Sequence, residues 1–190
     1  MNDQVLDWLY GVLVSPVQTL RVVAHERPAG AAVILLFATA LLQAMAGGPI
    51  AASQMSAFEL ELSRAWIIVG GSALSFLGSL VGIVVVYAAS ALFRPSGDLA
   101  GTLSSIGFAR FPALLGVPAG LLSGATGLGF LGGLISFGVG LWTLVLAVIA
   151  LRESRGLTTW TSVFSYLLGG VAVFVIVALL IIPILLLSVL

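Results

Sequence analysis

The chain has 190 residues, of which 61% are hydrophobic and only 7% are charged, against about 25% in ordinary soluble domains, so a water-soluble fold is nearly excluded. Seven basic and seven acidic residues give a net charge of zero, which leaves no basic surface for nucleic acid. There is no cysteine and only one histidine, so thiol chemistry and most metal sites are excluded as well. The composition predicts a small integral membrane protein without a cofactor.

Charge-free runs predict how the chain crosses the membrane. An ionised side chain deep in hydrocarbon costs several kcal/mol, so charges mark the ends of spans, and a span needs roughly 20 apolar residues. Runs 28–58, 65–93 and 156–190 each hold one span. Run 111–151 is long enough for two, separated by a Gly-rich turn at 124–129. We therefore expect an all-α bundle of five transmembrane helices, near 29–46, 65–92, 105–124, 130–151 and 160–187.

Residues 1–28 are predicted to be a cytoplasmic, interfacial segment ahead of the domain 29–190. Apolar residues at helical spacing in 2–14 indicate a short helix lying along the membrane surface. Ser15 followed by Pro16 is typical of an N-cap with proline at the first helical position, so a second short helix should begin there. Pro28 should end this helix and start the first span.

The distribution of arginine predicts the orientation of the chain. Under the five-span prediction six arginines lie on one side, and Arg64 is the only one on the other. The positive-inside rule then places the N-terminus in the cytoplasm and, after five crossings, the C-terminus outside. The six arginines are Arg21, Arg27, Arg94, Arg110, Arg152 and Arg155.

Small residues recur at four-residue spacing in the second, third and fourth predicted spans, for example at Gly78 and Gly82, and at Ser136 and Gly140. Such rows let helix backbones approach closely, so we expect these spans to form a tightly packed centre. The fifth span, rich in Val, Ile and Leu over 171–187, should face lipid. The alternative is that the small residues form a contact between two copies of the chain in a homodimer.

Arg110 is the charge whose position is hardest to explain. Pro112 to Gly124 spans only about 20 Å as a helix, so the third span must begin upstream, near Ser105, which draws Arg110 below the membrane surface. One alternative is a side chain that snorkels to the headgroups. The other is a contact with a lipid headgroup or a partner in a cytoplasm-facing cavity. Asp98 and Glu26 are the candidate counter-charges.

Enzymatic chemistry has little support. No predicted span contains Asp or Glu, which argues against aspartyl proteolysis and against the carboxylate relays of pumps and transporters. No histidine or lysine in the spans could activate a serine. A channel is harder to exclude, because hydroxyls and backbone carbonyls alone can line a pore.

Two stretches resemble a known family. Ser15-Pro16-Val-Gln-Thr19-Leu-Arg21, followed by Arg27-Pro28, is similar to the entry segment of bacterial Yip-domain membrane proteins. The segment from Gly101 to Pro112, with Gly107, Phe108 and Arg110, is similar to the family's segment before its third span. The resemblance covers essentially the whole chain and agrees with five spans. It marks eight positions as candidate binding residues: Ser15, Pro16, Thr19, Arg21, Pro28, Gly107, Arg110 and Pro112.

The resemblance implies a trafficking or organising role. Eukaryotic relatives bind Rab-type GTPases through a cytoplasmic N-terminal region, for which the roughly 28 residues before the first span leave no room, and bacterial relatives resemble the membrane domain alone. We expect a non-enzymatic, multi-pass protein of the bacterial plasma membrane that organises membrane or membrane-protein assemblies through its cytoplasmic face. Membrane lipids, a second copy or other membrane proteins are the expected partners. A small channel or permease subunit is the alternative.

Overall fold

The computed structural model describes residues 2–56, 63–118, 121 and 129–189, and all of its regular structure there is helical. The α-helices are α1 (Asn2–Val14), α2 (Pro16–Glu26), α3 (Ala29–Ser56), α4 (Arg64–Ser90), α5 (Leu99–Ala109), α7 (Gly129–Arg155) and α8 (Thr159–Val189). Short 3₁₀ helices are η1 (Ala91–Phe93) and η2 (Phe111–Leu115). The all-α class predicted from the sequence is therefore confirmed over these residues.

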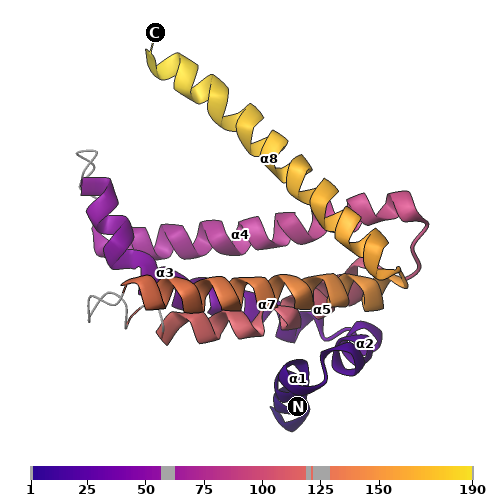
Figure 1. The fold of residues 1–190 in the computed structure, drawn as a ribbon. Coiled ribbons are helices and arrows are strands. Elements are labelled where there is room, and N and C mark those ends of the chain that lie inside the picture. The colour runs from indigo at the N-terminus through magenta and orange to yellow at the C-terminus, as the bar shows by residue number, and fades with distance from the viewer. Residues whose placement is uncertain (1, 57–62, 119–120, 122–128, 190) are drawn as a thin grey trace.

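Four helices are long and apolar enough to cross a membrane: Ala29–Gly47 within α3, Arg64–Phe93 in α4 and η1, Phe130–Arg155 in α7 and Thr159–Leu179 in α8. They coincide with the first, second, fourth and fifth predicted spans. α3 packs on α4, and α7 packs on α5 and α8, whereas α8 packs on α4 in its first half and then diverges from the bundle (Figure 1). Large apolar side chains such as Leu74, Phe137 and Phe174 are about three-quarters exposed, as expected for surfaces that face lipid.

The structure of the third predicted span differs from the prediction. The helix there begins earlier, at Leu99, and ends at Ala109. Arg110 and the 3₁₀ helix η2, which contains Pro112, follow it, because proline supplies no N–H for the α-helical ladder. Part of the predicted span, together with the Gly-rich turn, lies outside the described residues. The described part of 105–124 is thus not one continuous α-helix, and the span itself and the count of five crossings stay predictions.

The two short helices before the first span form as predicted. α2 has Pro16 at its first position and ends at Arg27, whose φ of 53° turns the chain into Pro28 and α3. Ser15 occupies the N-cap position, but its hydroxyl makes no capping hydrogen bond. The Ser15 carbonyl instead accepts from the backbone N–H and the hydroxyl of Thr19, at 3.1 Å each. The interfacial position of these helices stays a prediction.

Both short helices pack against the bundle rather than standing apart from it. Leu20 and Val23 of α2 are fully buried, and the ring of Trp8 meets Phe108 of α5 edge-on at 5.6 Å. The hydroxyl of Ser105 in α5 donates to the Leu20 carbonyl at 3.1 Å. Burying side chains of this size stabilises the contact by roughly 1.5–3 kcal/mol for each Val or Leu. The segment 1–28 is therefore part of the same packed unit as α5.

Close helix contacts occur at glycines outside the small-residue rows. A Cβ on Gly107 would lie 2.8 Å from the Cβ of Ala32, and one on Gly101 would lie 2.7 Å from the Ala24 carbonyl oxygen. In contrast, a Cβ on Gly78, Gly82 or Gly140 would meet no atom within 4 Å. The prediction that the small-residue rows mark tight contacts is wrong at these three positions, because the rows border hollow space instead.

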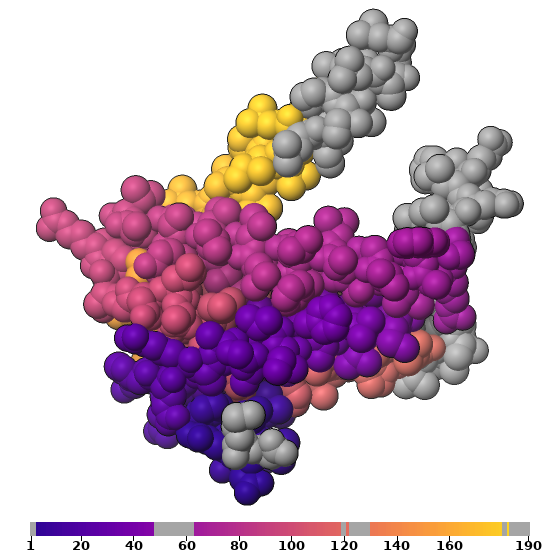
Figure 2. Space-filling model, turned by 180° about the vertical axis from the view of Figure 1, so that it is seen from behind, coloured from indigo at the N-terminus to yellow at the C-terminus, as the bar shows by residue number. Residues whose placement is uncertain are grey.

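α8 is divided between two roles. Its first half packs on α4, where a Cβ on Gly169 would lie 2.7 Å from a methyl group of Val86. Farther along, Val171, Phe174 and Leu179 are 61%, 74% and 67% exposed. In both views the part of α8 that holds these three residues extends away from the other helices (Figures 1 and 2). These three side chains are exposed, as the predicted contact with lipid requires, whereas the beginning of α8 is packed on α4, and the lipid contact itself stays a prediction.

Candidate functional site: the Arg-rich end and the Arg110 cavity

Charged side chains gather at one end of the bundle, which we call the Arg-rich end. It is formed by α2, the segment between α4 and α5, and the last turn of α7, which contact one another. Its basic residues are Arg21, Arg27, Arg94, Arg152 and Arg155. Arg64 lies at the far end of α4, so the structure separates the arginines largely as the five-span prediction did.

Glu153 joins α2 to α7 at this end. One of its carboxylate oxygens accepts from Nε of Arg21 at 2.7 Å, and the other lies 2.7 Å from a terminal nitrogen of Arg152. The Glu153 side chain is 8% exposed, whereas that of Arg21 is 60% exposed. Two cations compensate for the burial of one carboxylate, so the Arg21 guanidinium both pairs with Glu153 and remains open on its outer side.

Asp98 has two partners as well. One carboxylate oxygen accepts from the backbone N–H of Gly101 at 3.0 Å and so caps α5, while the other lies 2.9 Å from Arg27. A carboxylate in this position also interacts favourably with the dipole of α5. Asp98 was a candidate counter-charge for Arg110, but its ion pair in the structure is with Arg27. The second candidate, Glu26, accepts from the Gln4 amide at 2.8 Å.

Arg155 is the most buried arginine of the described chain, at 4% exposure. Its guanidinium donates to the Ser90 hydroxyl at 3.1 Å and to the Gly97 carbonyl at 2.6 Å, and it lies 4.1 Å from the centre of the Tyr87 ring. Its own carbonyl accepts from the backbone N–H of Ser96 at 2.9 Å. Arg155 thus ties the end of α7 to the end of α4 and to the loop that follows.

Arg110 lies inside the bundle. A terminal nitrogen of its guanidinium donates to the Ser79 hydroxyl of α4 at 2.7 Å. Ser79 lies in the middle of α4, about 16 Å of helix from Ser90 at the Arg-rich end. The Arg110 guanidinium therefore faces the inside of the bundle, and its contact with a lipid headgroup or a partner stays a prediction. No carboxylate of the described residues lies within 4 Å of Arg110.

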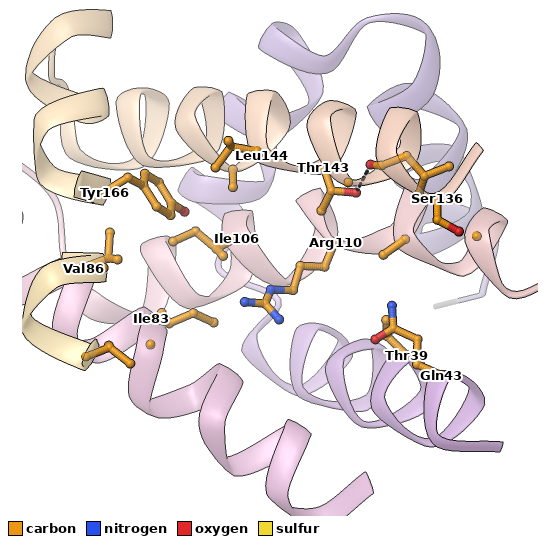
Figure 3. A pocket seen from close by; sticks show the side chains of 18 of the residues that line it. Thr39, Gln43, Ile83, Val86, Ile106, Arg110, Ser136, Thr143, Leu144 and Tyr166 are labelled. Carbon is orange, nitrogen blue, oxygen red and sulfur yellow. Dashed lines mark hydrogen bonds between the residues drawn. The ribbon is translucent and has the colours of Figure 1, made fainter. Parts of the chain in front are cut away.

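Two adjoining cavities meet at Arg110. The larger has a volume of about 710 Å³ and lies among α3, α4, α5, η2, α7 and α8, and the smaller, of about 330 Å³, lies between α3 and α4. Arg110, Thr39 and Gln43 line both. Figure 3 shows Arg110 and Tyr166 pointing into the space between the helices, with Thr39 and Gln43 on α3. The hydroxyl oxygen of Tyr166 is buried and has no hydrogen-bond partner in the described chain.

The candidate residues named by the sequence fall into two places. Ser15, Pro16, Thr19 and Arg21 lie together on α2 at the Arg-rich end, and Pro28 lies at the turn into α3. Gly107 packs on Ala32, and Pro112 is buried in η2. Of the eight, only Arg110 lines a cavity, so the set does not form one site. Their roles in binding stay predictions.

Several residues of these two regions were not found from the sequence. Glu153 was not singled out, Arg155 was only one of the six arginines that predicted the orientation, and Tyr166 and Gln43 were ordinary members of spans. The only available signal was polarity within apolar helices, since Gln43, Ser79 and Thr143 interrupt long apolar runs. Which of these polar groups meet depends on helix rotation, which the sequence does not specify.

Comparison with known families decides the classification. The model of the Yip1 domain matches residues 10–186, which covers nearly the whole chain. The chain belongs to the Yip1 domain family. With four helices able to cross a membrane, this Yip1 domain is a multi-pass integral membrane protein. No curated protein and no solved structure matches the chain.

The match includes both the Arg-rich end and the cavity around Arg110. It begins inside α1, includes the ion pair of Arg21 with Glu153, and ends near the C-terminal end of α8. The predicted membership, drawn from the segments at Ser15 and Gly101, is therefore confirmed.

Proposed function

We propose that this Yip1 domain protein organises membrane or membrane-protein assemblies through the Arg-rich end together with the adjoining helix α1, and that it does so without enzymatic activity. The observation that carries the proposal is the outer face of α1. Leu6 and Tyr10 are 62% and 69% exposed and Val14 is 63% exposed, at successive helical turns. α1 is held in place from beneath by Trp8 and the fully buried Val12, so this apolar row is presented on a rigid base.

An apolar row of this kind needs a neighbour that is not water. Lipid acyl chains at the interface or the apolar face of another protein would supply it, and the exposed Arg21 guanidinium on the adjoining helix α2 suits anionic headgroups or acidic side chains. A second copy of this chain or another membrane protein is the partner we propose, within a lipid surface.

A photo-reactive amino acid at Tyr10, activated in native membranes, tests the proposal. We expect discrete protein adducts, either with a second copy or with another membrane protein, and we expect Leu6→Glu to reduce them several-fold. Gln18→Glu, which adds the same charge at an exposed position of α2, is the matched control and should leave the adducts unchanged. Adducts with lipid alone, or adducts that persist in Leu6→Glu, would contradict the organising role.

We further propose that the Arg-rich end faces the cytoplasm of a bacterial cell, and that the C-terminus lies outside after five crossings. The charge distribution and the resemblance to bacterial members support this orientation. The chain has no cysteine, so Gln18→Cys and a C-terminal cysteine tag can each be labelled alone with an impermeant maleimide. Labelling of the tag but not of Gln18→Cys in intact cells is expected, and equal labelling of both would reject the five-span topology.

A second function, a small channel or permease subunit, draws its support from the cavity around Arg110. A space of about 710 Å³ with hydroxyl, amide and guanidinium groups inside the membrane could hold a solute. Flux across proteoliposomes that carry the protein, compared with empty vesicles over several ions and solutes, tests this candidate. Equal flux would reject it without affecting the organising role.

A further inference from the structure

The charge balance around Arg110 differs from that at the Arg-rich end. Arg21, Arg27 and Arg152 each lie within 3 Å of a carboxylate, at 2.7, 2.9 and 2.7 Å. Arg110 has a neutral hydroxyl, that of Ser79, and no carboxylate within 4 Å in the described chain. A guanidinium carries five N–H donors and is expensive to bury uncompensated in a membrane. The cavity therefore has an excess positive charge that an anion could neutralise.

The neutral polar groups nearby would bind the same kind of ligand. Thr39 and Gln43 of α3 line both cavities, and the buried Tyr166 hydroxyl of α8 lines the larger one without a partner in the described chain. The Gln43 amide and the Tyr166 hydroxyl are both hydrogen-bond donors, as a phosphate or carboxylate with several acceptor oxygens requires. Figure 3 shows these side chains arranged around the guanidinium of Arg110.

Most of the rest of the larger cavity is apolar, apart from Ser136 and Thr143 of α7. Ile83 and Val86 of α4, Leu144 of α7 and Val173 of α8 line it. Three glycines in its wall, Gly82, Gly140 and Gly170, contribute open space to the cavity, because a Cβ on any of them would meet no atom within 4 Å. α8 contributes to this wall and then diverges from the bundle, so the cavity adjoins a helix that faces lipid (Figure 1). A polar centre with apolar walls suits a ligand that has both characters.

We propose that the Arg110 cavity binds an amphiphile of the lipid class through its phosphate or carboxylate group. The anionic group pairs with the Arg110 guanidinium and accepts from Tyr166, while the hydrocarbon chain lies against the apolar walls toward α8. This site goes beyond the organising role and does not depend on it, since none of its residues lies on the exposed row of α1.

The test is a titration of the purified full-length chain in a neutral maltoside detergent, read as the shift in Tm. Dodecyl phosphate represents the amphiphile, inorganic phosphate the free anion, and added dodecyl maltoside the uncharged amphiphile. We expect a saturable rise in Tm with dodecyl phosphate and none with the other two at the same concentrations. An equal, saturable rise with inorganic phosphate would overturn the amphiphile and indicate a small-anion site.

Two variants tie the effect to the cavity. Arg110→Gln should weaken apparent affinity for dodecyl phosphate by about 10- to 100-fold, because a charge-assisted contact is lost. Gly140→Leu keeps the arginine and fills the cavity, so it should weaken binding at least about 10-fold by displacing the chain. Gly138→Leu is the matched control, since Gly138 is on the same helix, has equally open surroundings and lines neither cavity.

Gly140→Leu also keeps the proposal falsifiable if Arg110→Gln fails to fold. Unchanged dodecyl phosphate affinity in Gly140→Leu, or a loss of equal size in Gly138→Leu, would overturn the site. An unchanged apparent affinity for dodecyl phosphate in folded Arg110→Gln would show non-specific adsorption and would overturn the site as well.

Discussion

Arg155 and Arg110 are two partly or wholly buried arginines in one small bundle, and their surroundings differ. Arg155 lies at the ends of α7 and α4, where Ser90, the Gly97 carbonyl and the Tyr87 ring surround its guanidinium. Arg110 lies about half-way along the bundle, with the Ser79 hydroxyl and open space beside it.

The difference follows from where free acceptors exist in a helical protein. Backbone carbonyls in the middle of helices are already engaged in the helix, whereas those of loops and helix ends are free to accept from a side chain. Arg155 uses one of these free carbonyls, and Arg110 is too deep to reach any that the structure shows. Arg155, whose guanidinium binds a loop carbonyl, therefore stabilises the fold, whereas we propose that the Arg110 guanidinium, which donates to a single hydroxyl, is available to a ligand. The four predictions below test this contrast, from the largest expected effect to the smallest.

Gly97→Ala should have the largest effect. Gly97 has a φ of 81°, and a Cβ there would collide with the carbonyl oxygen of Ser154. Strain and displacement of the loop that Arg155 holds should cost about 4 kcal/mol or more, measured as loss of folded protein and of Tm in detergent. Gly30→Ala is the control, because a Cβ there meets nothing within 4 Å, and it should be neutral or slightly stabilising.

Arg155→Met should have the second-largest effect on stability. The substitution keeps much of the side-chain volume and removes two hydrogen bonds and the contact with Tyr87, leaving the Gly97 carbonyl unpaired, so we expect a loss of about 3 kcal/mol. Arg94→Met, at an exposed arginine of the same end, should change the free energy of unfolding by less than about 0.5 kcal/mol. Equal losses in the two variants would show that Arg155 has no special role in holding the helix ends.

Glu153→Gln should have a smaller effect. It leaves Arg21 and Arg152 beside a neutral amide, but Arg21 is already 60% exposed, so the expected loss is about 1 kcal/mol. The free energy of unfolding is measured at low and at high ionic strength. The difference in this free energy between wild type and variant should become smaller at high salt, because salt screens the ion pair. Glu26→Gln is the matched change, since Glu26 accepts from the neutral amide of Gln4. A difference in the free energy of unfolding that does not change with salt would argue against a stabilising ion pair of Glu153 with Arg21.

Arg110→Met should have the smallest effect on stability without ligand. Replacing a buried charge that lacks a carboxylate by an apolar side chain is expected to be neutral, or stabilising by up to about 1 kcal/mol. Denaturant unfolding of the ligand-free protein next to Arg155→Met measures this directly. A loss as large as that of Arg155→Met would mean that Arg110, like Arg155, mainly holds the fold.

Sequence alone determined the membrane class and most helix positions. Hydropathy and charge predicted four long helices that the structure contains, and Pro16 and Pro28 marked the limits of α2. These features depend on the local cost of placing polar groups in lipid and on the backbone restrictions of proline, so neighbouring residues suffice to predict them. The same reasoning failed at Pro112, where a broken helix replaced the expected continuous one.

Only the tertiary structure decided how the polar groups meet. Arg21 pairs with Glu153, 132 residues away, and Arg110 donates to Ser79 and lines the two cavities. Rows of small residues were compatible with tight contacts or with hollow space, and the rotation and divergence of the helices selected hollow space at Gly82 and Gly140. Such outcomes depend on the packing of all the helices at once, because a small rotation of one helix changes which side chains face each other.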